Sequence, residues 1–288
     1  MVVVLFIEVE HFCHKRTAGF ALNRICSDIS PREEWKTPLQ VDATEIRSIL
    51  NQPFTFFGKG AQCYAFLSQD QNYVLKFFRF DHLRPPMWLT HFPLPLFLHA
   101  YRDEKIALNR TKTERTFESY KIAYHDLKEE TGLVFVHLNW SDDLKLHTTI
   151  FDKLGIPHCL DMDSMHFILQ RRAQLLYPVI SQWMENKQLE QAKKGMNDLL
   201  ALLVSRYKKG IGDKDPDLCT NFGFLDNRPV QIDVGRFSRQ TDKRHESCLE
   251  EIVRITDKFN SWLKDQHPEL SDYLQEQIKT ITINETNN

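Results

Sequence analysis

The chain has 288 residues with a formal net charge of −2, and 42% of the residues are hydrophobic. This is the composition of a globular protein with a sizeable core, and the near-balance of charge gives no reason to expect nucleic-acid binding or a broad membrane-binding patch. The six cysteines are scattered without a CxxC pair, which argues against a disulfide framework or a zinc site. We therefore expect a cytoplasmic protein, with export as an effector as the alternative.

Residues 1–50 are interpreted as a leader or N-terminal extension. The apolar run at residues 2–7 is too short to span a bilayer and lacks the basic start of a signal peptide, so we expect a buried strand there and no membrane span. A helix is expected at residues 43–50. Apolar runs at residues 54–57 and 73–80 then surround a glycine-containing turn and a polar loop at residues 68–72, which is the pattern of a hairpin.

The middle and end of the chain alternate between helical and extended patterns. Apolar residues at helical spacing predict a helix over residues 111–130, with one face packed inward. Strands are expected at residues 133–138, 144–151 and 166–170. A long helix from about residue 187 ends in a basic last turn and Gly210, and a short strand at 230–234 and a final helix over 249–262 follow. This order predicts an α+β protein with a sheet-rich first lobe and a helical second lobe.

Two short segments near the end carry the strongest chemical signal. Residues 210–223 read Gly-Ile-Gly-Asp-Lys-Asp-Pro-Asp-Leu-Cys-Thr-Asn-Phe-Gly, and residues 232–237 read Ile-Asp-Val-Gly-Arg-Phe. Asn221 and Asp233, joined by a strand hairpin, would offer the oxygen ligands that Mg²⁺ prefers. An Asp- and Gly-rich surface loop is the ordinary alternative. An EF-hand is excluded, because Leu218 and Phe224 stand where its loop needs Gly and Glu.

These segments resemble the protein-kinase-like superfamily. Asn221 is similar to the catalytic-loop asparagine, residues 232–235 are similar to the DFG segment, and the Gly-Ile-Gly-Asp phrase also resembles the phosphoinositide kinases. The resemblance implies a bilobal protein-kinase-like fold with an N-lobe at residues 51–172 and a C-lobe at residues 173–288. It also implies that the protein binds ATP and Mg²⁺, with Asn221 and Asp233 on the metal.

A second element agrees with this resemblance. Gly58 and Gly60 lie in a turn that resembles the kinase Gly-rich loop, although Cys63 takes the place of the third glycine. Glycines allow the backbone to approach phosphates closely. Lys76 follows in the next strand and would hold phosphate oxygens under the loop. The alternatives are a plain hairpin turn and an edge lysine that reaches solvent.

The resemblance also requires a helix carboxylate to pair with Lys76. Glu118 lies where it is expected, in the middle of the predicted helix, and Glu114 is the rival one turn earlier. A solvated, highly charged helix face is the ordinary alternative. Residues 81–110 would then be an insertion before this helix. The hinge that binds adenine through its backbone is expected at residues 170–173.

The catalytic loop departs from the usual kinase pattern. The H-R-D-x-x-x-x-N spacing puts Pro216 at the position of the base, so the candidates are Asp213 and Asp215. Asp213 ranks first because it follows Gly-Ile-Gly, as the base does in the phosphoinositide kinases. No Ala-Pro-Glu motif follows Gly235.

These departures favour an atypical kinase that transfers the γ-phosphate of ATP to a hydroxyl of a protein, a lipid headgroup or a small molecule. A pseudokinase that binds nucleotide or a partner without catalysis is the first alternative. A helical interaction protein with a chance motif is the second.

Overall fold

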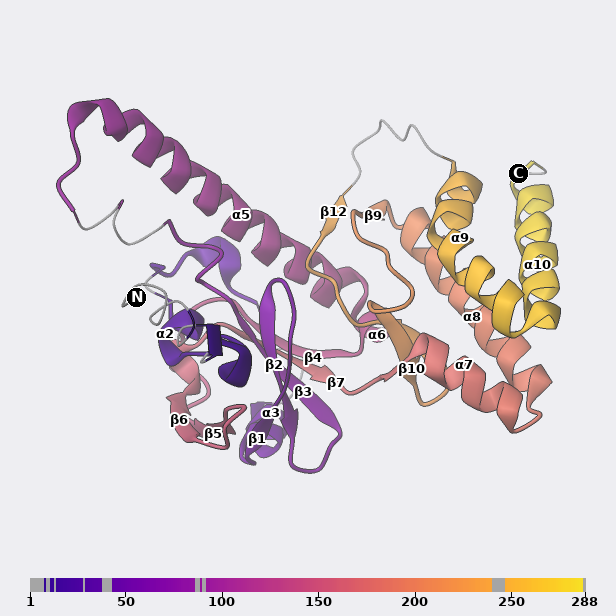
Figure 1. Cartoon of the computed structure of the whole chain (residues 1–288), viewed down its shortest axis with the longest axis horizontal. Helices are drawn as coiled ribbons and strands as arrows, with labels where there is room; N and C mark the ends of the chain where they lie inside the picture. Colours follow the sequence, from indigo (N-terminus) through magenta and orange to yellow (C-terminus); the bar gives the residue numbers. More distant parts are fainter. Residues whose placement is uncertain are drawn as a thin grey trace. The chain divides into compact units, whose positions relative to one another are not determined.

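The structure is a computed structural model that describes residues 8, 11–12, 14–27, 29–37, 43–85, 89, 92–239 and 247–286. It divides into two compact units (Figure 1). The first unit comprises Met1–Lys121 and Leu133–Arg171, and the second comprises Ile122–Gly132 and Arg172–Asn288. The expected strand at residues 2–7 lies outside the described residues.

The first unit is built on a seven-stranded sheet with the strand order β4-β7-β3-β2-β1-β5-β6. Its strands are β1 (Phe54–Lys59), β2 (Cys63–Ser68), β3 (Tyr73–Phe78), β4 (Leu133–His137), β5 (His147–Phe151), β6 (Pro157–Asp161) and β7 (Phe167–Arg171). Neighbouring strands are antiparallel, except that β1 and β5 run parallel. The hairpin β5–β6 therefore extends the sheet beyond β1.

The glycine-containing turn joins β1 to β2, and the polar loop at residues 68–72 joins β2 to β3. The prediction of one hairpin from two apolar runs was therefore incomplete, because residues 63–68 form a third strand between them. The burial pattern of β2 explains why the sequence hid it. This strand lies inside the sheet and has no exposed residue, so the alternation of apolar and polar residues that marks a half-buried strand is missing.

The N-terminal segment belongs to the core of the first unit. It contains the helices α2 (Leu22–Ile25) and α3 (Ala43–Leu50) and the 3-10 helix η1 (Glu33–Trp35); α3 confirms the predicted helix. Phe20 packs edge-on against Tyr64 and Phe66, with ring centroids 5.3 and 5.5 Å away. The hydroxyl of Tyr64 donates a hydrogen bond to the carbonyl of Gly19. These residues therefore form part of the first unit.

The long helix α5 (His99–Asp126) follows the 3-10 helix η2 (Leu96–Leu98) and passes from the first unit into the second. It begins twelve residues before the predicted start at residue 111. From Asn109 onward it buries residues at helical spacing, among them Phe117 and Tyr120, as predicted. None of its residues before Asn109 is buried, so no apolar period marked its first turns.

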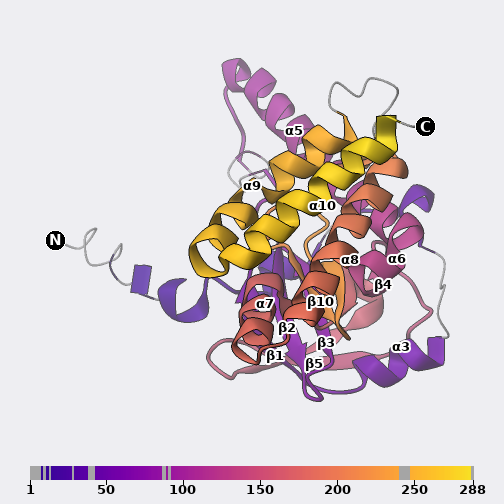
Figure 2. The ribbon, with the colours of Figure 1, turned by 90° about the vertical axis from the view of Figure 1, so that its right-hand side faces the viewer.

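The second unit is mainly helical. Besides the short helix α6 (Lys128–Thr131), it contains α7 (Leu176–Glu185), α8 (Leu189–Lys208), α9 (Cys248–Gln266) and α10 (Pro268–Thr286). Figure 2 shows α9 and α10 beside α8, and these helices enclose the core of the unit. A capping box starts α9, because Ser247 accepts from the backbone N–H of Glu250 and the Glu250 carboxylate accepts from the backbone N–H of Ser247.

Short strands complete the second unit. They are β8 (Gln174–Leu175), β9 (Ile211–Asp213), β10 (Phe222–Leu225), β11 (Arg228–Gln231) and β12 (Phe237–Arg239). They form one sheet with the order β11-β10-β8 and a second with the order β12-β9. The predicted α+β fold class is therefore confirmed: a sheet-rich first unit is followed in the chain by a mainly helical second unit.

Candidate functional site

The hairpin β10–β11 joins the two predicted metal ligands. Phe222 pairs with Gln231, and a two-residue turn at Asp226 and Asn227 links Leu225 to Arg228. Both turn residues have positive φ, as a type I′ turn requires. At the opposite end of the hairpin, the carbonyl of Asn221 accepts from the backbone N–H groups of Ile232 at 2.8 Å and Asp233 at 3.5 Å. Asn221 and Asp233 are therefore neighbours where the two strands end.

The side chains of Asn221 and Asp233 fit a hard cation. The amide nitrogen of Asn221 donates to the carbonyl of Asp215 at 2.7 Å, which fixes the orientation of the amide. Its oxygen accepts from the hydroxyl of Thr220 and has a second lone pair for a ligand. The exposed Asp233 carboxylate accepts from the backbone N–H of Gly235 through Oδ1. An amide oxygen and a carboxylate are suitable for Mg²⁺ that also binds phosphate and water.

Asp213, the first-ranked base, lies in a buried charged network. Its side chain is 2% exposed, and its Oδ2 lies 3.7 Å from Nη1 of Arg206. The side chain of Gln231 donates to this Oδ2 at 2.5 Å and accepts from Arg206 Nη1 at 2.7 Å. Arg206 also donates to Glu251 on α9. The Arg206 guanidinium therefore contacts both buried carboxylates, those of Asp213 and Glu251, and the Gln231 amide also donates to Asp213.

This network also touches the predicted metal ligand. The side-chain nitrogen of Gln231 lies 3.3 Å from the carbonyl of Asp233. Burial raises the pKa of Asp213; Arg206 opposes this shift, and the nearby Asp233 adds to it. The Asp213 carboxylate is therefore buried among protein groups: it contacts Arg206 and Gln231, and Gln231 in turn reaches the backbone of Asp233.

Sequence reasoning did not identify Arg206, Gln231 and Glu251 as site residues. Arg206 was interpreted only as a basic residue in the last turn of a helix, yet it is 1% exposed. A signal was present, because Arg206 follows Leu199 and Leu203 at helical spacing on the buried face of α8. A cation on an apolar stripe requires a buried partner.

Asp215 differs from Asp213 in its surroundings. Its backbone N–H donates to the Asp213 carboxylate at 2.9 Å, but its own side chain is 53% exposed. Arg236 lies 3.7 Å from its Oδ2 in a solvated ion pair. Asp215 is thus held next to Asn221 by its backbone while its carboxylate stays accessible to a ligand.

In the first unit, the glycine-containing turn is held by its neighbours. The backbone N–H of Gly60 donates to the carbonyl of Cys63, and the carbonyl of Gly60 accepts from Arg79 at 3.0 Å. Arg79 is almost fully buried and also contacts Asp81. A Cβ built on Gly58 would have no heavy atom within 4 Å. Gly58 itself lies within β1, opposite Ala65, and the place that its side chain would take is open.

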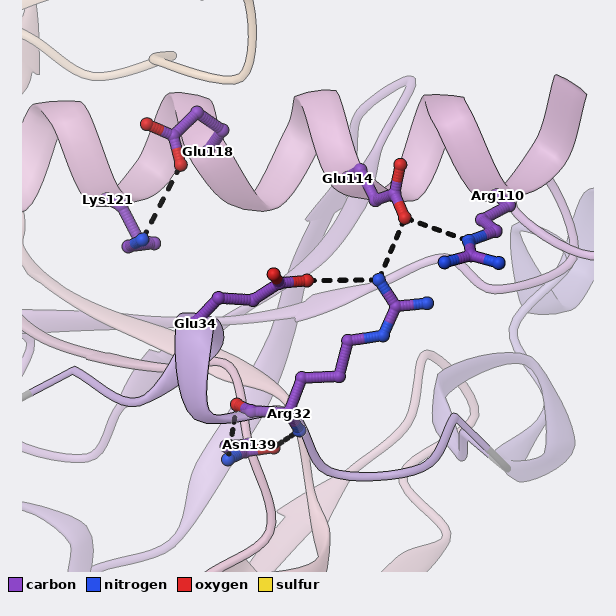
Figure 3. A network of polar contacts seen from close by, with 7 residues as sticks. All are labelled: Arg32, Glu34, Arg110, Glu114, Glu118, Lys121 and Asn139. Atoms are coloured by element: carbon purple, nitrogen blue, oxygen red, sulfur yellow. Dashed lines mark hydrogen bonds and ion pairs between the residues drawn. The ribbon is translucent and has the colours of Figure 1, made fainter. Parts of the chain in front are cut away.

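Lys76 is half-buried on β3, opposite Ala65 on β2 and Ile168 on β7. Glu118 lies on the exposed side of α5, where its carboxylate is 3.5 Å from Nζ of Lys121 (Figure 3). The ion pair between Lys76 and Glu118 stays a prediction.

The rival Glu114 has a structural role instead. Its carboxylate accepts from Arg32 at 2.8 Å and from Arg110 at 2.9 Å (Figure 3). The hydrogen bond from Arg32 is the largest of the effects that lower the pKa of Glu114. Two reciprocal hydrogen bonds between the backbone of Arg32 and the side chain of Asn139 fix the same segment. Glu114 therefore ties the N-terminal segment to α5, which leaves Glu118 as the candidate partner.

The second unit contains a cavity of about 420 Å³ beside the turn of the β10–β11 hairpin. Arg172 and Gln174 line it, next to the expected hinge, together with Trp183 and Phe224. Among the lining residues, Arg172 belongs to the expected hinge at residues 170–173, and none is one of the residues predicted to bind phosphate or metal or to act as the base. Among the described residues, no cluster of three or more His, Cys, Asp or Glu side chains forms a metal site.

No family model and no curated protein sequence matches the chain. Among solved structures, one of WbdD, described as a bifunctional kinase-methyltransferase, covers 68% of this chain and 34% of that chain, with 14% identity and a TM-score of 0.36. A second WbdD structure covers 78% and 45%, with 13% identity and a TM-score of 0.37. The complex of Rv3197 from Mycobacterium tuberculosis with erythromycin covers 92% and 73%, with 13% identity and a TM-score of 0.32.

None of these similarities assigns a function. The chain spans less than half the length of the WbdD chains.

Proposed function

We propose that this chain is an atypical kinase that transfers the terminal phosphoryl group of ATP to a hydroxyl acceptor. The observation that carries the proposal is the β10–β11 hairpin, which joins Asn221 to Asp233 through backbone hydrogen bonds. Phosphoryl transfer needs mainly positioning and neutralisation of charge. The Asn221 amide oxygen and the Asp233 carboxylate, at one end of the hairpin, would position a cation that neutralises charge. The accessible Asp215 next to them would position the acceptor.

Each unit would contribute its own groups. In the first unit, the backbone at Gly58 and Gly60 would approach the phosphates closely because no side chain intervenes, and Lys76 would give a positive charge, oriented by Glu118. In the second unit, Asn221 and Asp233 would hold Mg²⁺. When bound, this ion supplies neutralisation of the charge on the phosphates.

Of the two predicted bases, the surroundings favour Asp215, which reverses the order expected from the sequence. The Asp213 carboxylate is closed off by Gln231 and Arg206, so a hydroxyl acceptor would have to displace buried partners. The Asp215 carboxylate is exposed, and its ion pair with Arg236 is solvated. We assign Asp215 the role of orienting the acceptor and taking its proton. Asp213 is then a positioning residue that accepts from the backbone of Asp215.

Thermal unfolding with ATP, in the presence and absence of Mg²⁺, tests the binding roles. ATP with Mg²⁺ should raise the melting temperature of the wild type. Lys76→Met should reduce this shift, and Asp233→Asn should remove its dependence on Mg²⁺. Asp257→Asn, at an exposed site on α9, is the matched control and should behave as the wild type. If neither ATP nor Mg²⁺ shifts the wild type, the nucleotide site does not exist.

Transfer of radiolabelled phosphate to the protein itself, to lipid headgroups or to small alcohols tests catalysis. Asp215→Asn should keep the ATP-dependent shift but slow transfer on the order of 10²- to 10⁴-fold. A wild-type protein that shows the shift and no transfer to any acceptor would be the alternative, a pseudokinase that binds nucleotide. Full activity of Asp215→Asn with loss in Asp213→Asn would restore the original order of the two bases.

A further inference from the structure

Residues 92–98, which precede α5, and the first turns of α5 up to residue 108 form an exposed apolar segment. We call this segment the apolar tip (residues 92–108). No residue of the tip is buried. It contains six of the fourteen exposed large hydrophobic side chains in the described part of the chain: Phe92, Leu96, Phe97, Tyr101, Ile106 and Leu108. Leu96, Phe97 and Phe92 are the most exposed of them, at 86, 79 and 67%. Concentrated exposed apolar surface marks an interaction site.

The tip stands away from the sheet of the first unit. In Figures 1 and 2, the beginning of α5 extends beyond the strands. Burial on α5 starts only at Asn109. The polar contacts within the tip are local: His99 contacts the carbonyl of Leu94, and Arg102 pairs with Asp103. Nothing in the described core of the unit therefore accounts for the apolar side chains here.

The chemistry of this segment is that of a membrane interface. Residues 84–102 contain no Asp or Glu, although the chain as a whole has 39 acidic residues, and Asp103 and Glu104 are the first acidic residues after this stretch. The same stretch contains Trp88, Tyr101 and several Leu and Phe residues, which are the side chains that settle at the boundary between headgroups and acyl chains. Two basic residues lie at the end of this stretch and just after it: Arg102, and one turn later Lys105, whose Nζ is 5.3 Å from the ring centroid of Tyr101.

A lipid surface fits these features better than a protein partner. An apolar end with basic side chains behind it can enter the acyl boundary while the cations remain among phosphates. None of the described helices is both long and apolar enough to cross a bilayer, so the tip would enter one leaflet only. The near-neutral charge of the chain is compatible with this mode, because it depends on a local apolar segment and not on a broad basic face.

We propose that the apolar tip inserts into the surface of a lipid bilayer and anchors the first unit there, with Lys105 on anionic headgroups and Arg102 exchanging its exposed ion pair with Asp103 for a headgroup phosphate. This anchoring is independent of whether the chain transfers phosphate. If the chain does transfer phosphate, a membrane at the tip would bring lipid headgroups, one of the three acceptor classes named above, close to the protein.

Flotation of the full chain with vesicles tests the proposal. The probes are vesicles of phosphatidylcholine alone and of phosphatidylcholine with about one third phosphatidylserine. The wild type should float with both and bind the anionic vesicles more tightly. The double variant Leu96→Asp and Phe97→Asp should bind on the order of 100-fold more weakly. Its matched control is Leu154→Asp and Val253→Asp, two exposed apolar residues elsewhere, which should bind as the wild type does.

Three further readouts decide between insertion and other uses of the tip. Phe97→Trp should show a blue shift of its emission on addition of vesicles, against the background of the five native tryptophans. Arg102→Gln with Lys105→Gln should lose the preference for anionic vesicles and keep binding to neutral ones. Unchanged thermal unfolding of the aspartate variant would show that its loss of binding is not a loss of fold.

Three results would overturn the proposal. The first is a wild type that floats with neither vesicle, and the second is an aspartate variant that floats as well as the wild type. The third is a concentration-dependent dimer, without lipid, that the aspartate variant abolishes; the tip would then be a contact between two copies of the chain.

Discussion

At the level of single residues, Gln231 connects the groups on which the candidate site depends. Its amide accepts from Arg206, donates to Asp213 and reaches the carbonyl of Asp233. An amide is suited to this place, because it offers a donor and an acceptor without adding a charge. A carboxylate here would add a third negative group to Asp213 and Glu251.

Replacing Gln231 by Leu should destabilise the protein by about 2–4 kcal/mol, because Arg206 and Asp213 lose a buried partner. Urea unfolding of the purified variant measures the change. Gln275→Leu, at an exposed position of α10, is the control and should change the free energy of unfolding by less than about 0.5 kcal/mol. An equal effect of both substitutions would contradict the role given to the network.

His166 gives the first unit a dependence on pH. It is 1% exposed, and its ring lies between those of Phe80 and Phe117, with centroids 5.5 and 5.6 Å away. Its Nδ1 has no hydrogen-bond partner among the described residues. Burial, with a smaller contribution from His137, lowers the pKa of His166 to about 3 from an ordinary value of 6.5.

The sign of the effect follows from proton binding. Between pH 6.5 and 3 the unfolded chain binds a proton at His166 that the folded chain does not. Stability should therefore fall as the pH is lowered through this window, by up to about 1.4 kcal/mol per pH unit. His166→Leu should flatten the pH profile of the free energy of unfolding, while His147→Leu at an exposed site should leave it unchanged. A profile that does not respond to His166→Leu would assign the acid sensitivity to other groups.

At the level of elements, the β10–β11 hairpin positions Asn221 and Asp233 and is itself held against β8. Gly223 on β10 pairs with Leu175 on β8. A Cβ on Gly223 would lie 2.3 Å from the carbonyl oxygen of Gln174. Because this contact is with backbone, a rotamer change cannot relieve it.

Gly223→Ala should therefore lower stability by about 1–3 kcal/mol, as overpacking does. It should also weaken any binding of Mg²⁺ and ATP, because the hairpin would move. Gly58→Ala is the matched comparison, since its Cβ would meet open space; the free protein should keep its stability. Chemical denaturation of both variants checks the difference, and equal stabilities would mean that β8 and β10 separate without cost.

Much of this element structure could be predicted from the sequence, and the failures have physical causes. Apolar periodicity located α3, the inner part of α5 and most of α8, because these helices bury one face. It missed β8 and β12, because strands of two or three residues are defined by their pairing with distant segments. It also missed the start of α5, where no residue faces a core, and the helices α7 and α10.

The same division applies to the candidate site. Asn221 and Asp233 are twelve residues apart in the chain, so the local sequence was enough to predict that a strand hairpin joins them. The contact of Arg206 with Glu251 joins positions 45 residues apart. No local pattern contains such a pair. Asp213 is buried because Arg206 on α8 and Gln231 on β11 cover it, whereas Asp215 is exposed. The residues next to the two aspartates in the sequence do not reveal this difference.

At the level of the whole molecule, each unit has its own hydrophobic core. The first core gathers around Phe54, Phe66 and Phe77, and the second around Leu199, Phe222 and Phe259. Separate cores allow the two units to unfold in separate transitions, so that each free energy of unfolding predicted above belongs to the unit that contains the substitution.

Core substitutions should therefore act on one unit at a time. Phe66→Ala should speed hydrogen exchange mainly in the strands of the first unit, and Leu199→Ala mainly in the helices of the second, each with a loss of about 2–5 kcal/mol. Hydrogen exchange followed by mass spectrometry of peptides measures this. Equal acceleration throughout the chain by either substitution would show that the two cores melt together.

The parallel pairing of β5 with β1 has a consequence for self-association. Because β5 and β6 continue the sheet, its two borders are β4 and β6. The hydroxyl of Thr37 donates to the carbonyl of Val136 on β4, and β6 begins with Pro157, which has no N–H to offer. Neither border presents a full row of open backbone groups to a second chain. The sheet is thereby guarded against the edge-to-edge recruitment from which amyloid-like fibrils grow.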